Sequence, residues 1–148
     1  MNPYDEVYVS NIMRNQGRVF FDVREALPGV DEQWFVIHYM KSKVRSLLDH
    51  ANPKFAAMPS PELIDYFIRK EQNNVYKKGE EWGGFLPQWV GIIYSLYQWQ
   101  YNIPSNELVT LLPPVTMEKI YPTLHQLSFE AAVKKIHDEL LCLTFGNY

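Results

Sequence analysis

A polar stripe is predicted within residues 31–49, where His38, Ser42, Arg45 and Asp49 stand at positions i, i+4, i+7 and i+11. On one continuous helix, residues with this spacing share a face. One interpretation is an anion or carboxylate site built on His38, Arg45 and Asp49, which would suit a small-molecule-binding protein or a minor enzyme. The other is the solvated face of an amphipathic helix, on which Arg45 and Asp49 only pair with each other. The pattern favours the second interpretation.

A metal site is not predicted. Zinc sites need cysteine and histidine residues clustered at ligand spacing. No two histidines of this chain are four residues apart, and the only cysteine, Cys142, lies in the last predicted helix. The sequence therefore predicts neither a metal ion nor a cofactor. The four histidines are His38, His50, His125 and His137.

Covalent catalysis is not predicted either. Leucines flank Cys142 in an apolar turn, and burial there would raise the pKa of its thiol, which disfavours a nucleophilic thiolate. No G-x-S-x-G motif supports a serine nucleophile. Gly83–Gly84 is an isolated pair and not part of a phosphate-binding loop. We therefore expect a protein that is not an enzyme.

Aromatic residues are the strongest positive signal. The chain has 10 Tyr, 4 Trp and 8 Phe, and Tyr and Trp are concentrated between Tyr76 and Tyr101. These two types are favoured at protein interfaces, and so small a domain is not expected to bury all of them. The alternative is that the rings form plain core, with their polar tips at its rim. The residues predicted to contact a protein partner are Trp82, Trp89, Tyr97, Trp99, Gln100 and Tyr101.

Gln100 belongs to this set because it projects from the apolar arc of Trp89, Ile93 and Leu96. A buried amide without a hydrogen bond costs about 1–3 kcal/mol. Three placements are open for its side chain: a hydrogen-bonded network in the core, a partner surface, or water at the end of the helix.

The elements that must position these residues are helices, because apolar residues recur with helical spacing along nearly the whole chain. The sequence therefore predicts an all-α fold. Residues 18–27 are ambiguous: Val19, Phe20 and Val23 fit a helix, but a short strand near 18–24 also fits. The expected helices cover residues 3–14, 31–49, 60 to about 70, 87–101, 105–112, 116–121 and 129–143.

The helix over residues 87–101 is expected to be central, because apolar and aromatic side chains cover about two-thirds of it. Gly91, Ser95 and Gln98 form the remaining strip, and the two small residues would let another backbone come close. We expect a small helical bundle around this helix, with an N-terminal half (1–75) and a C-terminal half (76–148) in one compact domain. The polar, glycine-rich residues 73–84 are the candidate boundary.

Composition excludes several classes of protein. The chain has 148 residues, 47% of them hydrophobic, so it can bury enough surface to fold. Its net charge of −3 gives no bulk electrostatic reason to bind nucleic acid. The most apolar window, residues 89–97, is too short for a membrane span, and the first residues do not resemble a signal peptide. A single cysteine suits a reducing compartment, so we expect a cytoplasmic protein.

Short elements in the last third of the chain carry a family resemblance. They are Tyr101–Ile103, Ser105, Glu107, Leu108, Leu111, Leu112, Tyr121, Leu124–His125 and Ile136–Asp138. In them the chain resembles a family of small uncharacterised bacterial helical proteins with the pattern YNIS…E…LF…Y…LHTQG…DIDEF. Members are often encoded beside ADP-ribosyltransferase-like toxins, so the resemblance implies an antitoxin-like role. It also implies that His125 matches the family histidine and bonds backbone groups at the turn before the last helix.

The sequence thus predicts a non-enzymatic module that binds a protein partner and occludes it, as an antitoxin or a defence or mobile-element accessory protein would. A ligand-binding protein or enzyme that uses the polar stripe is the alternative. A structural homodimer joined through the aromatic surface is the second alternative.

Overall fold

The computed structural model describes residues 1–141, and within this range the chain is helical with no strand, which confirms the all-α prediction. A single antiparallel bridge joins Val30 and Lys78. The helices are η1 (Glu6–Tyr8), α1 (Val9–Ala26), α2 (Glu32–Met40), α3 (Lys43–Leu48), α4 (Pro53–Ala56), α5 (Ser60–Glu71), α6 (Leu86–Tyr101), α7 (Ser105–Leu111), α8 (Pro114–Leu124), α9 (Phe129–Ile136) and a final π-helical turn η2 (His137–Leu141).

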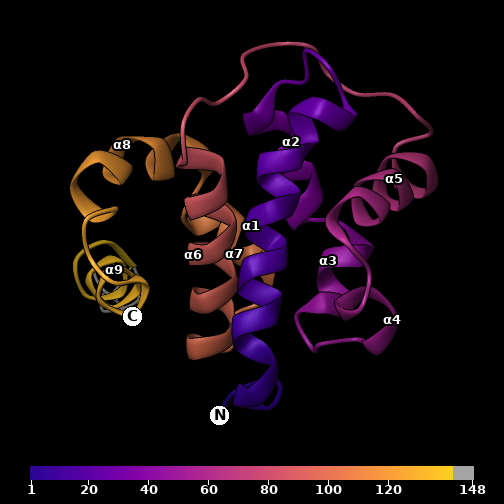
Figure 1. Cartoon of the computed structure of the whole chain (residues 1–148). Helices are drawn as coiled ribbons and strands as arrows, with labels where there is room; N and C mark the ends of the chain where they lie inside the picture. The colour runs from indigo at the N-terminus through magenta and orange to yellow at the C-terminus, as the bar shows by residue number, and fades with distance from the viewer. Residues whose placement is uncertain (142–148) are drawn as a thin grey trace.

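Helices α1 and α6 lie side by side at the centre and run in opposite directions (Figure 1). Helices α3, α4 and α5 lie on one side of this pair, and α8 and α9 lie on the other. Helix α2 contacts α1, α3, α7 and α8. One hydrophobic core contains residues from both ends of the chain, including Phe20 and Tyr39 from the first half and Ile93 and Val133 from the second. The halves over 1–75 and 76–148 therefore share one core.

Residues 18–24 lie inside α1, so the strand alternative is wrong. Val19, Phe20 and Val23 are all buried on one face of this helix, which explains why helical packing prevails there. The helix begins at Val9 and continues through Gly17 to Ala26, whereas the sequence predicted an earlier helix that ended near residue 14.

Small residues bring α1 and α6 into backbone contact. A Cβ atom added at Gly91 would strike the carbonyl oxygen of Gln16 and lie 2.8 Å from the Cα atom of Gly17. The predicted close approach at Gly91 is therefore confirmed. The strip of Gly91, Ser95 and Gln98 is buried against α1 and α3 rather than open to water.

We expect Gly91→Ala to lower the free energy of unfolding by about 1–3 kcal/mol, because the new methyl group must push two helix backbones apart. Alanine has the higher helix propensity, by about 1 kcal/mol, so the clash has to exceed that gain. Urea unfolding followed by circular dichroism measures the change. Gly83→Ala is the control, since nothing lies within 4 Å of a Cβ atom added there. A stabilised Gly91→Ala variant would contradict the close approach.

The helix predicted over residues 31–49 is two helices. α2 ends at Met40, and α3 starts at Lys43 after Ser42, whose hydroxyl accepts a hydrogen bond from the Arg45 N–H at 3.0 Å. Serine prefers an N-cap to a helix interior because its side chain bonds the free N–H groups there. This break changes which side chains of the segment face the core.

Candidate functional site

Arg45 and Asp49 form a buried ion pair and not a solvated face. Their side chains are 1% and 6% exposed, and Nη1 of Arg45 lies 3.4 Å from Oδ1 of Asp49. Arg45 also donates to the Ser95 hydroxyl at 3.3 Å. The Asp49 carboxylate accepts the backbone N–H of Ser105 at 2.9 Å and its hydroxyl at 2.5 Å. The pair therefore connects α3 to α6 and α7, which is a structural role.

His38 lies apart from that pair. Its ring is exposed and stacks on Trp34, with the ring centroids 4.5 Å apart, and its Nδ1 atom lies 2.9 Å from the Trp34 carbonyl oxygen. The break after α2 removes the common stripe with Arg45 and Asp49. The structure does not bring these three residues together, so the alternative of a ligand site built on them is wrong. The favoured interpretation, a solvated face, is wrong for Arg45 and Asp49 and holds for His38.

The buried amide of α6 is Gln98 and not Gln100. Gln98 is 1% exposed and donates from Nε2 to the Asp49 carbonyl oxygen at 3.1 Å, whereas Gln100 is exposed. Gln98 shares its strip of α6 with Gly91 and Ser95, and the part of the interior that this strip faces is polar.

Several aromatic residues predicted to bind a partner are core. Trp82 and Trp89 are 5% exposed and Tyr97 is 1% exposed, so the expectation of an open surface is wrong for these three. The Tyr97 hydroxyl lies 2.7 Å from Nδ1 of His137, whereas the buried Nε1 atom of Trp89 has no hydrogen-bond partner. Tyr101 is half-buried and stacks on the same imidazole, with the centroids 3.8 Å apart.

His125 has the local contact that was predicted for it. Its Nδ1 atom lies 2.8 Å from the Tyr121 carbonyl oxygen, and its ring stacks on the Tyr121 ring at the turn between α8 and α9. Cys142 lies outside the described residues. Within residues 1–141, no group of three or more His, Cys, Asp or Glu side chains could hold a metal ion.

One buried acid, Glu32, was not predicted from the sequence. Glu32 begins α2 with no exposed surface, and its Oε1 atom accepts the Trp82 N–H at 2.8 Å while its buried Oε2 atom has no hydrogen-bond partner. Burial raises the pKa of Glu32 to about 7, against the lowering effects of the Trp82 N–H and Arg24. An acid directly after an Asp N-cap usually faces water, so its position gave no signal of burial.

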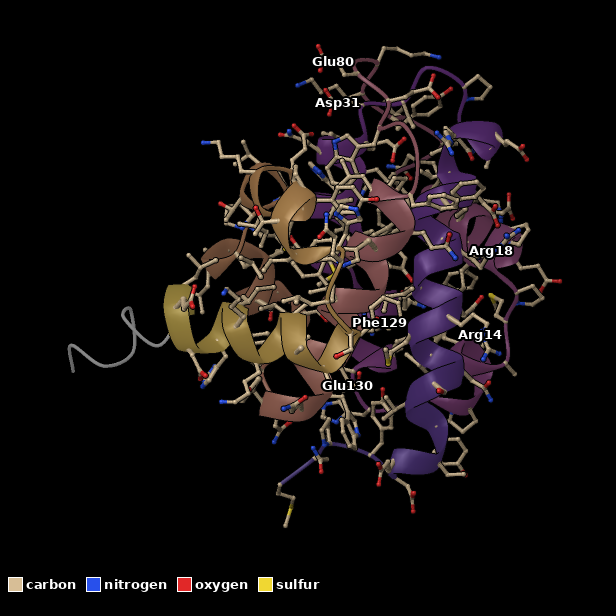
Figure 2. All side chains as sticks on the ribbon, turned by 60° about the vertical axis from the view of Figure 1, so that its left-hand side comes forward. Arg14, Arg18, Asp31, Glu80, Phe129 and Glu130 are labelled. Atoms are coloured by element: carbon tan, nitrogen blue, oxygen red, sulfur yellow. The ribbon has the colours of Figure 1, made fainter. Side chains whose placement is uncertain are left out.

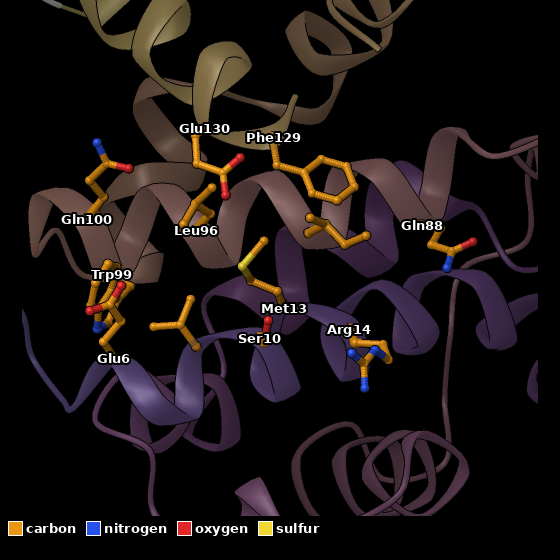
Figure 3. A pocket seen from close by; sticks show the side chains of 12 residues that line it. Glu6, Ser10, Met13, Arg14, Gln88, Leu96, Trp99, Gln100, Phe129 and Glu130 are labelled. Atoms are coloured by element: carbon orange, nitrogen blue, oxygen red, sulfur yellow. The ribbon is translucent and has the colours of Figure 1, made fainter. Parts of the chain in front are cut away.

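A groove runs along the contact between α1 and α6, and the start of α9 forms its third wall (Figure 3). The hollow has a volume of about 620 Å³ and is open to solvent along one side. We call it the α1/α6 groove. Its apolar lining consists of Val9, Met13, Ile92, Leu96, Trp99 and Phe129, and its polar lining consists of Glu6, Ser10, Arg14, Gln88, Gln100 and Glu130.

A second hollow of about 250 Å³ continues the groove toward the N-terminus of α6. The two hollows share Gln88, Ile92 and Phe129. Phe85 and Phe129 border the second hollow, and they are 71% and 39% exposed. Two exposed aromatic rings thus border one hollow, and apolar residues gathered at one place on a surface are typical of interaction sites.

Of the six residues predicted to contact a partner, Trp99 and Gln100 line the α1/α6 groove, and Trp89 lines the second hollow. Trp82, Tyr97 and Tyr101 line neither hollow. Phe85 and Phe129 were not among the residues predicted to contact a partner. Phe85 follows the polar, glycine-rich residues 73–84, which predicted a boundary and not a surface. Phe129 shares helical spacing with Ala132, Val133 and Ile136, which is typical of a core position.

The α1 and α9 walls face the same side of the molecule, where Arg14 on α1 lies opposite Phe129 and Glu130 on α9 (Figure 2). Asp31 and Glu80, near Glu32, lie at the far end of the molecule in the same view. The groove and the buried acid are therefore separate features.

No family model, curated protein or solved structure matches the chain. None of the helices between residues 1 and 141 has the length and apolar character needed to cross a bilayer.

Proposed function

We propose that this chain is a non-enzymatic protein-binding module whose α1/α6 groove receives a segment of another protein. The observation that supports this proposal is the exposure of Phe85 and Phe129 beside a groove with an apolar floor and a polar rim. Protein interfaces combine an apolar centre, rich in aromatic residues, with a polar rim. A small molecule is usually held in a more enclosed pocket that buries most of its surface.

Occlusion of the partner is the mechanism we propose. A segment seated in the groove would cover a surface that its own protein needs, as an antitoxin covers a toxin. The antitoxin-like role is part of the proposal and comes from the resemblance of the last third of the chain. A reducing, cytoplasmic setting is also part of it, since the chain has one cysteine.

Ser10→Arg is expected to abolish partner capture without unfolding the protein. Ser10 is exposed on α1 and lines the groove, so an arginine there fills the hollow with a long charged side chain. Tagged wild type and variant are each used to capture proteins from a lysate of the source organism, and mass spectrometry measures the stoichiometric partner. We expect at least a tenfold loss, which corresponds to about 1.4 kcal/mol.

Ser46→Arg is the matched control, because it makes the same change at an exposed helical residue of α3 that lines no hollow described above. A partner that binds wild type and Ser46→Arg but not Ser10→Arg supports the proposal. A partner captured equally by both variants uses another surface, which contradicts it. Captured copies of this chain alone, with a particle mass of twice 17.5 kDa, support the homodimer alternative instead.

A further inference from the structure

We infer that the segment seated in the α1/α6 groove is an amphipathic helix with a basic side chain toward the Trp99 end and an acidic side chain toward the Gln88 end. This inference rests on the proposed function. It specifies the chemistry of the partner from the shape of the groove and from the charges on its rim.

The backbone of the docked segment is the first reason to expect a helix. The groove floor is apolar, with Val9, Met13, Ile92 and Leu96, so it offers few partners for the N–H and C=O groups of an extended segment. An extended segment also cannot pair as an added strand, because residues 1–141 contain no sheet. A helix bonds its own backbone groups and presents only side chains to the floor.

The shape of the groove is the second reason. It lies between two antiparallel helices and extends along α6 from Gln88 to Gln100, which is about 18 Å at 1.5 Å per residue. A helix of about 12 residues matches this length and offers three or four apolar side chains at i, i+4, i+7 and i+11. It would complete a layer of three helices with α1 and α6.

The rim charges are separated along the groove. Glu6 and Glu130 lie toward the Trp99 end, and Arg14 lies toward the Gln88 end (Figure 3). All three side chains belong to exposed residues, and none takes part in an ion pair with another residue of the described range 1–141. Complementary charges on a partner would pair with them, and reversed charges would meet like charges. The rim therefore selects a basic group at one end and an acidic group at the other.

The test uses a display library of 18-residue helical peptides as the probe. Each peptide has a stripe of Leu, Ile, Phe or Met at helical spacing, and the flanking positions are randomised among Lys, Glu, Gln and Ala. Selection is performed on the wild-type protein, with counter-selection on Ser10→Arg. A parallel selection uses a triple variant with reversed rim charges, Glu6→Lys, Glu130→Lys and Arg14→Glu, all at exposed positions.

We expect the wild type to enrich peptides with Lys at one end and Glu at the other, and the triple variant to enrich the opposite order. Peptides selected on the wild type should bind the triple variant about tenfold more weakly or worse, since several rim contacts change sign. This inference is overturned if the enriched helices show no preferred order of Lys and Glu, or the same order on the wild type and the triple variant. Either result leaves the proposed function standing. No enrichment on the wild type over Ser10→Arg overturns both.

Discussion

Asp49→Ala is expected to lower the free energy of unfolding by about 3–5 kcal/mol, because it leaves the Arg45 guanidinium buried without its counter-charge. The Ser105 N–H and hydroxyl also lose their acceptor. Since whole domains of this size are stable by about 5–15 kcal/mol, the loss is a large part of the total. Urea unfolding monitored by circular dichroism gives the value.

The matched control is Asp138→Ala, which removes the acid of another i,i+4 pair. Lys134 and Asp138 lie 2.8 Å apart, closer than the buried pair, but their side chains are 71% and 50% exposed. We expect no measurable loss there, because water replaces the missing partner. The double variant Arg45→Met with Asp49→Ala should lose less than the sum of the single variants. The prediction is contradicted if Asp49→Ala and Asp138→Ala lower the free energy of unfolding equally. It is also contradicted if the double variant loses the sum of the two single losses, because burial would then not set the strength of this pair.

The same pair shows how far the sequence determines the fold. The i,i+4 spacing of Arg45 and Asp49 predicted their contact, and that contact is present. Their burial was not predicted, because a helical wheel drawn over residues 31–49 assumes one continuous helix. Ser42 starts a new helix, which turns His38 to water and Arg45 to the core. A serine inside an apolar helical pattern was the available signal for this break.

Helix α6 shows a second limit of sequence analysis. The strip of Gly91, Ser95 and Gln98 was visible as different from the rest of the helix, and the close approach at Gly91 followed from residue size. Which way the strip faces depends on the chain packed against it. Ser95 and Gln98 meet Arg45 and Asp49, so a polar strip lies in the interior. A periodic pattern identifies a distinct face of a helix, but the tertiary partner decides whether that face is buried.

The candidate site required three segments that are distant in the sequence. Trp99 and Gln100 were predicted to lie on a binding surface, and they line the α1/α6 groove. The other wall residues come from the start of α1 and the start of α9, where periodicity alone predicted only core faces and solvated faces. Tyr97 was predicted for the surface but is buried, with its hydroxyl 2.7 Å from Nδ1 of His137, so the core accommodates the polar end of its ring.

Glu32→Gln is expected to stabilise the protein above pH 7, and to change its stability little near pH 4.5. Burial, opposed by the Trp82 N–H and Arg24 and aided by Glu81, raises the pKa of Glu32 to about 7 in the folded chain from 4.5. Below pH 4.5 the Glu32 carboxyl group is neutral in both the folded and the unfolded chain, so it does not make the free energy of unfolding depend on pH. As the pH rises from 4.5 to 7, the Glu32 carboxyl group ionises in the unfolded chain before it does so in the folded chain. Folding then requires this group either to take up a proton or to bury its charge, so the wild-type protein loses stability.

The cost of the buried charge is on the order of 2–3 kcal/mol at pH 8. Glutamine avoids this cost, because it resembles the protonated acid and keeps an oxygen for the Trp82 N–H at the place where residues 77–82 meet α2. The measurement is the difference in unfolding free energy between Glu32→Gln and wild type from pH 4.5 to 8.5, which should grow with pH. Glu25→Gln, which removes an exposed carboxylate from α1, serves as the control for the loss of one negative charge. A difference that stays constant across this pH range would mean that Glu32 is solvated in the folded chain, and its contact with Trp82 would then be too weak to fix the segment before α6.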